Sequence, residues 1–406
     1  MRRIESILLV AALLASGCES QSQKNKDQAM KRWQAARAHL TIDMARQQFE
    51  QGQVKRALAT TENVLQNSPT YAPAHVLLGS IYLEQDRLAA AKEAFTRATA
   101  LDPGSGEAHY GLGVLAERRQ QLEVALEHYQ TAWQSQPDKP MYLLAVVDTQ
   151  VAMGDVAGAL ARLEGALGQV EENPSLYLTA GRLCMQLGQR ERAVAFYREA
   201  RLLAPESAMV RETLGLALLE TGQAAEALGY FQELATEAER QNLDSRWVYE
   251  LGKGDCYFAL GQYHEAQRAY ELVCNDNPSD ARAWARQAQA ALAGEKLDVA
   301  RLCAQRSVAL DGANPDAGLV LGCLALKEKE YAAAERTFRT LTEQSPQNAM
   351  VRCLLGQSLE GQGRINEAQQ CYQQALRLDP QDELVQDLVE ESQATQISEQ
   401  SAVEMQ

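Results

Sequence analysis

The stretch APAHVLLGSIYLEQDRLAAAKEAFTRATALDP, residues 72–103, reads as two short amphipathic helices joined by a turn. Apolar residues recur at helical spacing in both halves, and Gln85, Asp86 and Arg87 lie between them where the chain turns. A helix pair this short cannot bury its apolar face alone. The sequence therefore predicts that the pair packs against further copies of itself.

The pair recurs with a period of 34 residues, and one alanine shows this best. With residue 72 as position 1, position 20 is alanine in ten frames, the last four after an insertion of five residues: Ala57, Ala91, Ala125, Ala159, Ala193, Ala227, Ala266, Ala300, Ala334 and Ala368. Position 8 is Gly or Ala in every frame but one, which has Val147, and position 24 is mostly large and apolar. Glycine costs a helix about 1 kcal/mol relative to alanine, so its recurrence predicts a packing role. We expect the small residues to let the two backbones approach and the position-24 side chain to fill the space towards the next pair.

The prolines give an independent check of this register. All eleven fall between position 32 of one frame and position 2 of the next. Proline breaks a helix interior but suits its first turn or the gap before it. With this single register, no proline falls in the interior of a predicted helix.

These residues resemble the tetratricopeptide repeat, whose small, aromatic and proline positions are matched by Leu78, Gly79, Tyr82, Ala91, Phe95, Ala98 and Pro103. The resemblance implies an all-α fold, an α-solenoid in which about ten helix pairs form a right-handed superhelix with a C-terminal capping helix. The array would cover residues 30–382, with repeats starting near residues 38, 72, 106, 140, 174, 208, 247, 281, 315 and 349. It also implies a binding scaffold and not an enzyme.

Residues 1–18 differ in kind from the array. Arg2 and Arg3 precede an apolar run at residues 7–14, which is too short to span a bilayer and is typical of a signal peptide. The run ends in Ala-Ser-Gly-Cys, which resembles a bacterial lipoprotein signal with Cys18 as the lipidated residue. An ordinary signal peptide or an uncleaved anchor is the alternative. Residues 19–29 are polar, as in a flexible tether.

Two further segments depart from the plain repeat. The five extra residues before Trp247 continue a helical pattern, so we expect a longer second helix in the sixth pair. At the C-terminus, residues 383–393 carry an apolar stripe on an acidic helix and are predicted to cap the last repeat. Residues 394–406 are predicted to be a disordered acidic tail.

Net charge limits the partners. The formal charge is −15, and loss of residues 1–18 with Arg2, Arg3 and Glu5 would make it −16. This balance argues against nucleic acid and against adsorption to anionic lipid, so membrane attachment would come from the lipid anchor alone.

The sequence contains no recognisable metal-binding, nucleotide-binding or catalytic motif. No two of the five histidines are spaced as a helical metal pair, and no nucleotide or hydrolase motif occurs. His75 and His109 occupy equivalent positions and could meet, although surface histidines are the plainer interpretation. We expect no cofactor and no metal. The cysteines are interpreted mainly as buried thiols, with Cys353 and Cys371 as the best disulfide candidates.

Binding is therefore the expected activity. The resemblance implies that positions 2, 5, 9, 12 and 13 of each first helix line a concave groove, although the apolar ones could equally be helix packing. Asp148 and Arg182 are charged members that could instead pair with each other. The predicted partner-binding residues are Val76, Leu83, Tyr110, Leu144, Asp148, Leu178, Arg182, Met185, Leu251, Asp255, Phe258 and Leu319.

These observations predict a non-enzymatic scaffold that is lipid-anchored in a bacterial cell envelope, with the outer membrane facing the periplasm as the favoured location. It would bind a partner helix or peptide. The resemblance to tetratricopeptide lipoproteins suggests assembly of a secretion, pilus or polysaccharide-export machine. The alternative is an adaptor that recruits an envelope enzyme such as a peptidoglycan hydrolase.

Overall fold

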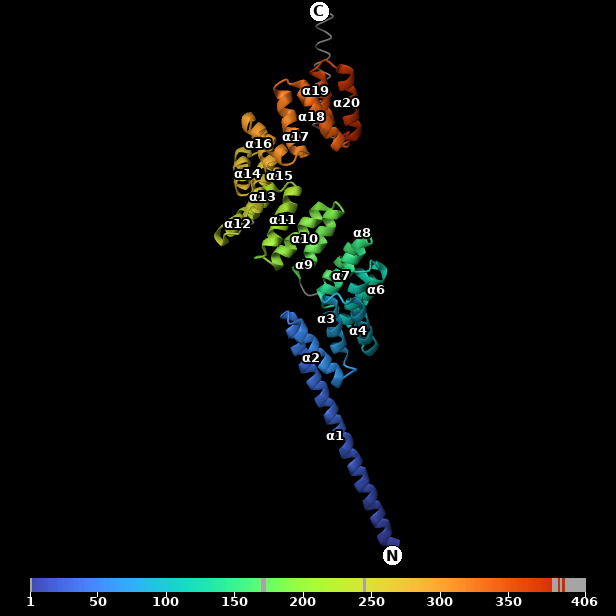
Figure 1. The fold of residues 1–406 in the computed structure, drawn as a ribbon. Helices are drawn as coiled ribbons and strands as arrows, with labels where there is room; N and C mark the ends of the chain where they lie inside the picture. Colours follow the sequence, from blue (N-terminus) through green and yellow to red (C-terminus); the bar gives the residue numbers. More distant parts are fainter. Residues whose placement is uncertain (1, 169–172, 244–245, 382–385, 388, 391–406) are drawn as a thin grey trace, which may run out of the picture. The chain divides into compact units, whose positions relative to one another are not determined.

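The computed structural model describes the backbone of residues 2–168, 173–243, 246–381, 386–387 and 389–390, and their side chains apart from residues 2–24 and 27. All regular secondary structure in these residues is helical, which confirms the predicted all-α class (Figure 1). The helices of this described part are α1 (Arg2–Glu50), α2 (Val54–Asn67), α3 (Ala72–Glu84), α4 (Leu88–Leu101), α5 (Gly106–Glu117), α6 (Leu122–Ser135), α7 (Pro140–Ala152), α8 (Val156–Leu167), α9 (Pro174–Gln186), α10 (Arg190–Leu203), α11 (Ala208–Glu220), α12 (Ala224–Gln241), α13 (Arg246–Ala259), α14 (Tyr263–Asp276), α15 (Ala281–Ala293), α16 (Leu297–Leu310), α17 (Pro315–Lys327), α18 (Tyr331–Gln344), α19 (Ala349–Glu360) and α20 (Ile365–Leu378).

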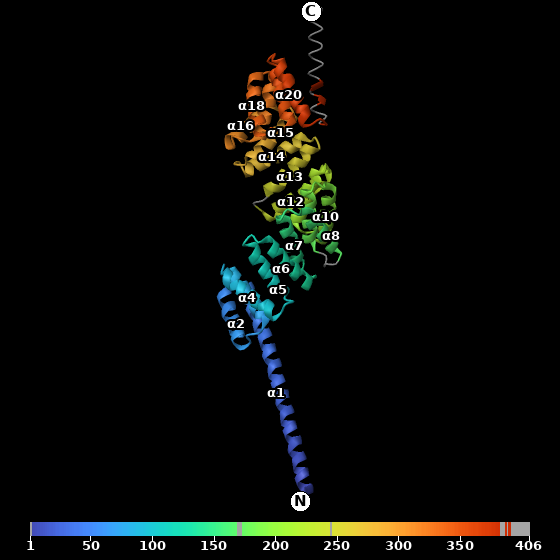
Figure 2. The same cartoon turned by 90° about the vertical axis from the view of Figure 1, so that its right-hand side faces the viewer.

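Consecutive helices form pairs, as α3 does with α4 and α19 with α20, and we call the successive pairs α1–α2 to α19–α20 repeats 1–10. First helices also contact the first helix of the next repeat, as α3 does with α5 and α15 with α17. The chain forms two compact bodies, an N-terminal body of residues 1–196 and a C-terminal body of residues 197–406. Within each body, the helices of neighbouring repeats lie side by side (Figure 2), and their side chains supply the apolar cover that a single pair lacks.

The helix starts follow the sequence register. The first helices of repeats 2–10 begin at the residues where the repeat frames start, or one residue earlier in the case of α13. Proline stands in the first turn of α3, α7, α9 and α17, and Ser105, Ser207 and Asn348 cap α5, α11 and α19 by accepting a backbone N–H. Helix α12 has 18 residues where α14 has 14, so the longer second helix of repeat 6 is confirmed.

Every turn between the two helices of a repeat contains one left-handed residue at position 15. Six are glycines with φ between 72° and 88°, and four are not, namely Asp86, Gln120, Glu295 and Lys329. A left-handed residue after a helix lets its backbone N–H satisfy a carbonyl of the last turn. This position fixes how the second helix folds back, and it is strained at the four residues that are not glycine.

The role of the position-8 glycines differs from the sequence interpretation. They make room for the aromatic ring at position 24 of the same repeat, not for a second backbone: a Cβ on Gly79 would lie 2.7 Å from the Phe95 ring. The expected reach towards the next repeat is present as well, because a Cβ on Gly111 would lie 2.4 Å from the same ring. The Phe95 ring is therefore held between two repeats.

A recurrent hydrogen bond links each of several repeats to the turn before it. The position-4 side chain donates to a proline carbonyl six residues earlier: His75 Nε2 to Pro69 at 2.9 Å, and Trp284 Nε1 to Pro278 at 3.0 Å. His109 makes the same bond, and its Nδ1 lies 3.3 Å from His128 Nδ1. His109 therefore contacts His128 of its own repeat, and an approach of His75 to His109 stays a prediction.

Three other sequence expectations concern the ends and the cysteines. Helix α1 is continuous through the predicted signal and tether, so their division at Cys18 stays a prediction. Most of residues 383–393 and all of 394–406 lie outside the described residues, but Val389 is buried against repeat 10. Cys371 is a free thiol, so the suggested disulfide with Cys353 is wrong.

Candidate partner-binding groove

The first helices of repeats 1–4 enclose a cavity of about 330 Å³ in the N-terminal body, which we call the inner groove. Helical spacing explains its lining, because positions 2, 5, 9 and 12 point to one side of a helix. Apart from Lys139, which directly precedes α7, the lining residues lie on α1, α3, α5 and α7: Arg46, Phe49, Glu50, Val76, Leu77, Ser80, Glu107, Tyr110, Met141 and Tyr142.

A charge network crosses the inner groove. Arg46 donates from both terminal nitrogens to the two carboxylate oxygens of Glu107, at 3.2 and 3.1 Å, and Lys139 Nζ donates to the same carboxylate at 3.4 Å. Burial opposes ionisation of Glu107, but the hydrogen bond and charge of Arg46 outweigh it and hold the pKa of the carboxyl below its usual value. The groove therefore presents one fixed anion between two cations, all three of them partly exposed.

Aromatic side chains form the floor beside this network. The Tyr110 ring lies 5.4 Å from the rings of both Tyr129 and Tyr142, measured between centroids. Burial raises the pKa of Tyr142 to about 12, so the tyrosine stays neutral at ordinary pH. Met141 is 49% exposed at the edge. This combination of aromatic, apolar and charged groups suits a peptide that offers side chains of both kinds.

The structure brings only two of the predicted binding residues into this cavity, Val76 and Tyr110. Leu83 packs against the core around Phe95, and Leu251 and Phe258 pack against the core around Tyr270. The remaining apolar members are also half-buried on the first helices α7, α9 and α17: Leu144, Leu178, Met185 and Leu319.

The charged members of the set have partners within the chain. Arg182 donates to Asp148 at 3.1 Å, an exposed ion pair between repeats 4 and 5. Asp255 accepts a hydrogen bond from the Tyr270 hydroxyl at 2.6 Å. Contact of any of these residues with a partner stays a prediction.

Sequence reasoning missed Glu107, Lys139, Met141 and Tyr142. Glu107 and Met141 stand at position 2, which the resemblance already placed in the groove, so that position was the available signal. No comparable signal exists for Lys139, which precedes the helix. In the C-terminal body, Met209 and Leu216 are exposed apolar residues at positions 2 and 9 of α11.

Among the described residues, no group of three or more His, Cys, Asp or Glu side chains could hold a metal ion. None of the described helices combines the length and apolarity that a membrane crossing requires.

Comparison with known proteins agrees with this architecture. Two sequence profiles, both described as tetratricopeptide repeat, match residues 76–140 and 251–316 and residues 48–99, 150–215 and 325–391. TPR repeat-containing protein MJ1428 of Methanocaldococcus jannaschii is 25% identical over 240 residues, which is 58% of this chain and 41% of that protein. Cellulose synthase 2 operon protein C of Komagataeibacter xylinus is 28% identical over 295 residues, or 71% of this chain and 20% of that protein.

The chain thus spans less than half the length of these two relatives. A solved tetratricopeptide repeat protein from Parabacteroides merdae superposes with a TM-score of 0.50 at 18% identity, over 63% of this chain and 98% of that one. This likeness concerns the fold alone.

Proposed function

The chain belongs to the tetratricopeptide repeat family, and we propose that it is a lipid-anchored scaffold of a bacterial cell envelope. It would hold a partner peptide or helix in its inner groove. The observation that carries the binding proposal is the amphipathic lining of that groove. Tyr110 and Met141 offer apolar surface beside the Arg46–Glu107–Lys139 network, and a partner with apolar and charged side chains would match both.

The envelope part of the proposal rests on the N-terminal sequence. Residues 7–14 are apolar and lead into Cys18, as in lipoprotein signals, and the polar residues after Cys18 would separate the array from the membrane. Acylation of one cysteine by several chains gives stable attachment, whereas one chain is marginal. A scaffold held in this way would present its groove to components of a machine at the membrane.

A secretion, pilus or polysaccharide-export machine is the assembly that we propose. The similarity to a cellulose synthase operon protein supports the polysaccharide option among the three, over 71% of this chain. The adaptor alternative, recruitment of an envelope enzyme, has no such support.

Anchoring is tested by replacing Cys18 with alanine and fractionating bacterial cells that produce the full chain. We expect the wild-type chain in the membrane fraction and the C18A chain outside it, with equal amounts of both. Retention of the variant in the membrane would contradict lipidation at Cys18. Differential solubilisation of the two membranes then tests the proposed outer-membrane location.

Groove binding is tested by purifying the wild-type chain and a Tyr110→Ala variant with their bound proteins. A partner that is recovered with the wild type and lost from a folded variant supports the proposal. Arg46→Ala gives a second test that leaves the aromatic floor in place.

A further inference from the structure

A cavity of about 1050 Å³ lies over α3 and α4 of the N-terminal body, outside the inner groove. Four of its lining residues are cations, Arg87, Lys92, Arg97 and Arg119, and only one is a carboxylate. We call this surface the outer basic groove. A concentration of positive charge is unexpected in a chain whose net charge is −15.

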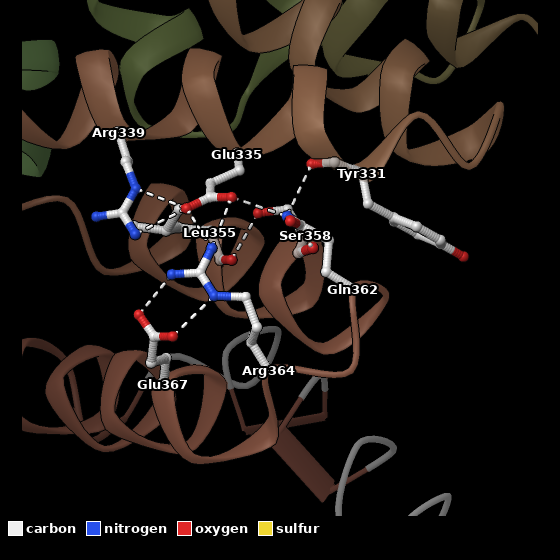
Figure 3. Close-up of polar contacts among 8 residues, drawn as sticks. All are labelled: Tyr331, Glu335, Arg339, Leu355, Ser358, Gln362, Arg364 and Glu367. Atoms are coloured by element: carbon white, nitrogen blue, oxygen red, sulfur yellow. Dashed lines mark hydrogen bonds and ion pairs between the residues drawn. The ribbon is translucent and has the colours of Figure 1, made fainter.

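The other repeats show why these cations are unusual. At two junctions of the C-terminal body, a side chain at position 21 of a second helix contacts position 14 of the next repeat. Between repeats 8 and 9 this contact is the ion pair Arg301–Glu328. In repeats 9 and 10, Gln362 Nε2 donates to Glu335 at 2.8 Å in the same place (Figure 3).

Repeats 2 and 3 place two cations at these positions, Lys92 and Arg119, and both line the outer basic groove. Two like charges that line one cavity repel each other, which costs free energy in the empty groove. In the described part of the chain, neither of them lies within 4.0 Å of a carboxylate, nor does Arg87 or Arg97. The positions that join repeats 8 and 9 and repeats 9 and 10 are thus left, in repeats 2 and 3, with positive charge to be neutralised by a ligand.

Two more features shape the surface. The Arg87 guanidinium lies over the Tyr82 ring, 4.2 Å from its centroid, with only a long 3.5 Å contact to Gln85. This stacking holds the cation in place while its N–H groups remain open to a ligand. Leu78 and the small side chains of Ala90 and Ala94 form an apolar surface between the charges.

We propose that the outer basic groove binds an acidic peptide segment of a protein partner, as a second interaction surface independent of the inner groove. Arg87 and Arg97 are ten residues apart, so the cations extend about 15 Å along α4. A single small anion meets only part of that length. A peptide with several carboxylates and a few apolar side chains matches both the charges and the apolar surface between them.

The test measures fluorescence anisotropy of a labelled peptide of about twelve residues, enough to cover this length as a helix, made of glutamate and leucine. The purified full-length chain is titrated into it, and a peptide with lysine in place of glutamate serves as the charge control. We expect binding of the acidic peptide only, weakening as salt is added. Absence of binding by the wild-type chain would overturn the proposal.

Lys92→Glu combined with Arg97→Glu should weaken binding by about tenfold or more. The matched control is Arg306→Glu with Arg336→Glu, which makes the same charge change at exposed cations on α16 and α18. An equal loss in the control would show nonspecific attraction and contradict the proposal. Inorganic phosphate and phosphatidylglycerol vesicles are titrated in parallel, and binding of either at these residues without binding of the peptide would also overturn it.

The single variant Lys92→Glu separates binding from folding. It places a carboxylate opposite Arg119, the reverse of Arg301–Glu328, so its melting temperature should equal or exceed that of the wild type while peptide binding falls. Should it melt lower, Lys92→Gln removes the charge with less perturbation. Unchanged peptide binding by a folded Lys92→Gln chain would contradict the assignment.

Discussion

Substitution of three helical glycines by alanine tests how the repeats are packed. Gly254, Gly215 and Gly229 lie on α13, α11 and α12 of the C-terminal body and differ in what an added Cβ would meet. At Gly254 the Cβ would lie 2.4 Å from the Tyr270 ring, at Gly215 it would lie 3.1 Å from the Phe231 ring, and at Gly229 nothing lies within 4 Å.

The magnitudes follow from two opposing effects. Alanine stabilises a helix relative to glycine by about 1 kcal/mol, and this gain applies at all three positions. Overpacking a core costs about 1–3 kcal/mol. The Tyr270 ring is buried and its hydroxyl is bonded to Asp255 at 2.6 Å, so it cannot move aside without further loss.

We therefore expect Gly229→Ala to raise the free energy of unfolding by about 0.5–1 kcal/mol, Gly215→Ala to change it little, and Gly254→Ala to lower it by about 1–2 kcal/mol. Urea denaturation followed by circular dichroism gives the order. Because long repeat arrays lose two-state behaviour, amide hydrogen exchange in α13 and α14 measures the local effect of the Gly254 change. A Gly254→Ala chain as stable as the Gly229→Ala chain would refute the packing of the Tyr270 ring against Gly254.

Three further predictions concern turns and titration. Lys329 has φ of 61°, so Lys329→Gly should stabilise repeat 9 by up to about 1 kcal/mol in urea denaturation, and a loss would contradict the assigned turn. Burial disfavours the charged form of Glu335, but hydrogen bonds from Gln362, Arg339 and Arg364 outweigh it and lower the carboxyl pKa from 4.5 to about 2 (Figure 3). The stabilisation of the fold by the ionised carboxylate should be present above pH 4.5 and disappear as the pH falls towards 2. Glu335→Gln should weaken this pH dependence in acid unfolding. Burial and the neighbouring His109 lower the pKa of His128, so stabilisation present above pH 6.5 should be lost as the pH falls, and His128→Gln should reduce that loss in thermal melts.

Much of the fold is predictable because local residue requirements repeat. Alanine at position 20 and proline between helices fix the register, and the helix starts follow it. The residue that packs against each position-8 glycine cannot be predicted from one repeat, because the ring that fills the space beside the glycine is 16 residues away on the other helix. Gly79 and Phe95 illustrate this, and only their three-dimensional contact showed which groups meet.

The candidate site was less predictable. Arg46 and Glu107 are 61 residues apart, and nothing local to either indicates the bond that joins α1 to α5. Lys92 and Arg119 are equally ordinary as single surface cations. Their significance comes from two equivalent places, where positions 21 and 14 of neighbouring repeats make a favourable contact.

Photo-crosslinking at two exposed apolar positions of the N-terminal body shows whether a partner occupies the inner groove. A photoreactive residue replaces Met141, which lines the groove, or Val124, which lies on the second helix α6; they are 49% and 43% exposed. We expect the co-purifying partner to crosslink at position 141 and not at 124. Crosslinking at 124 with none at 141 would show that the partner binds outside the inner groove.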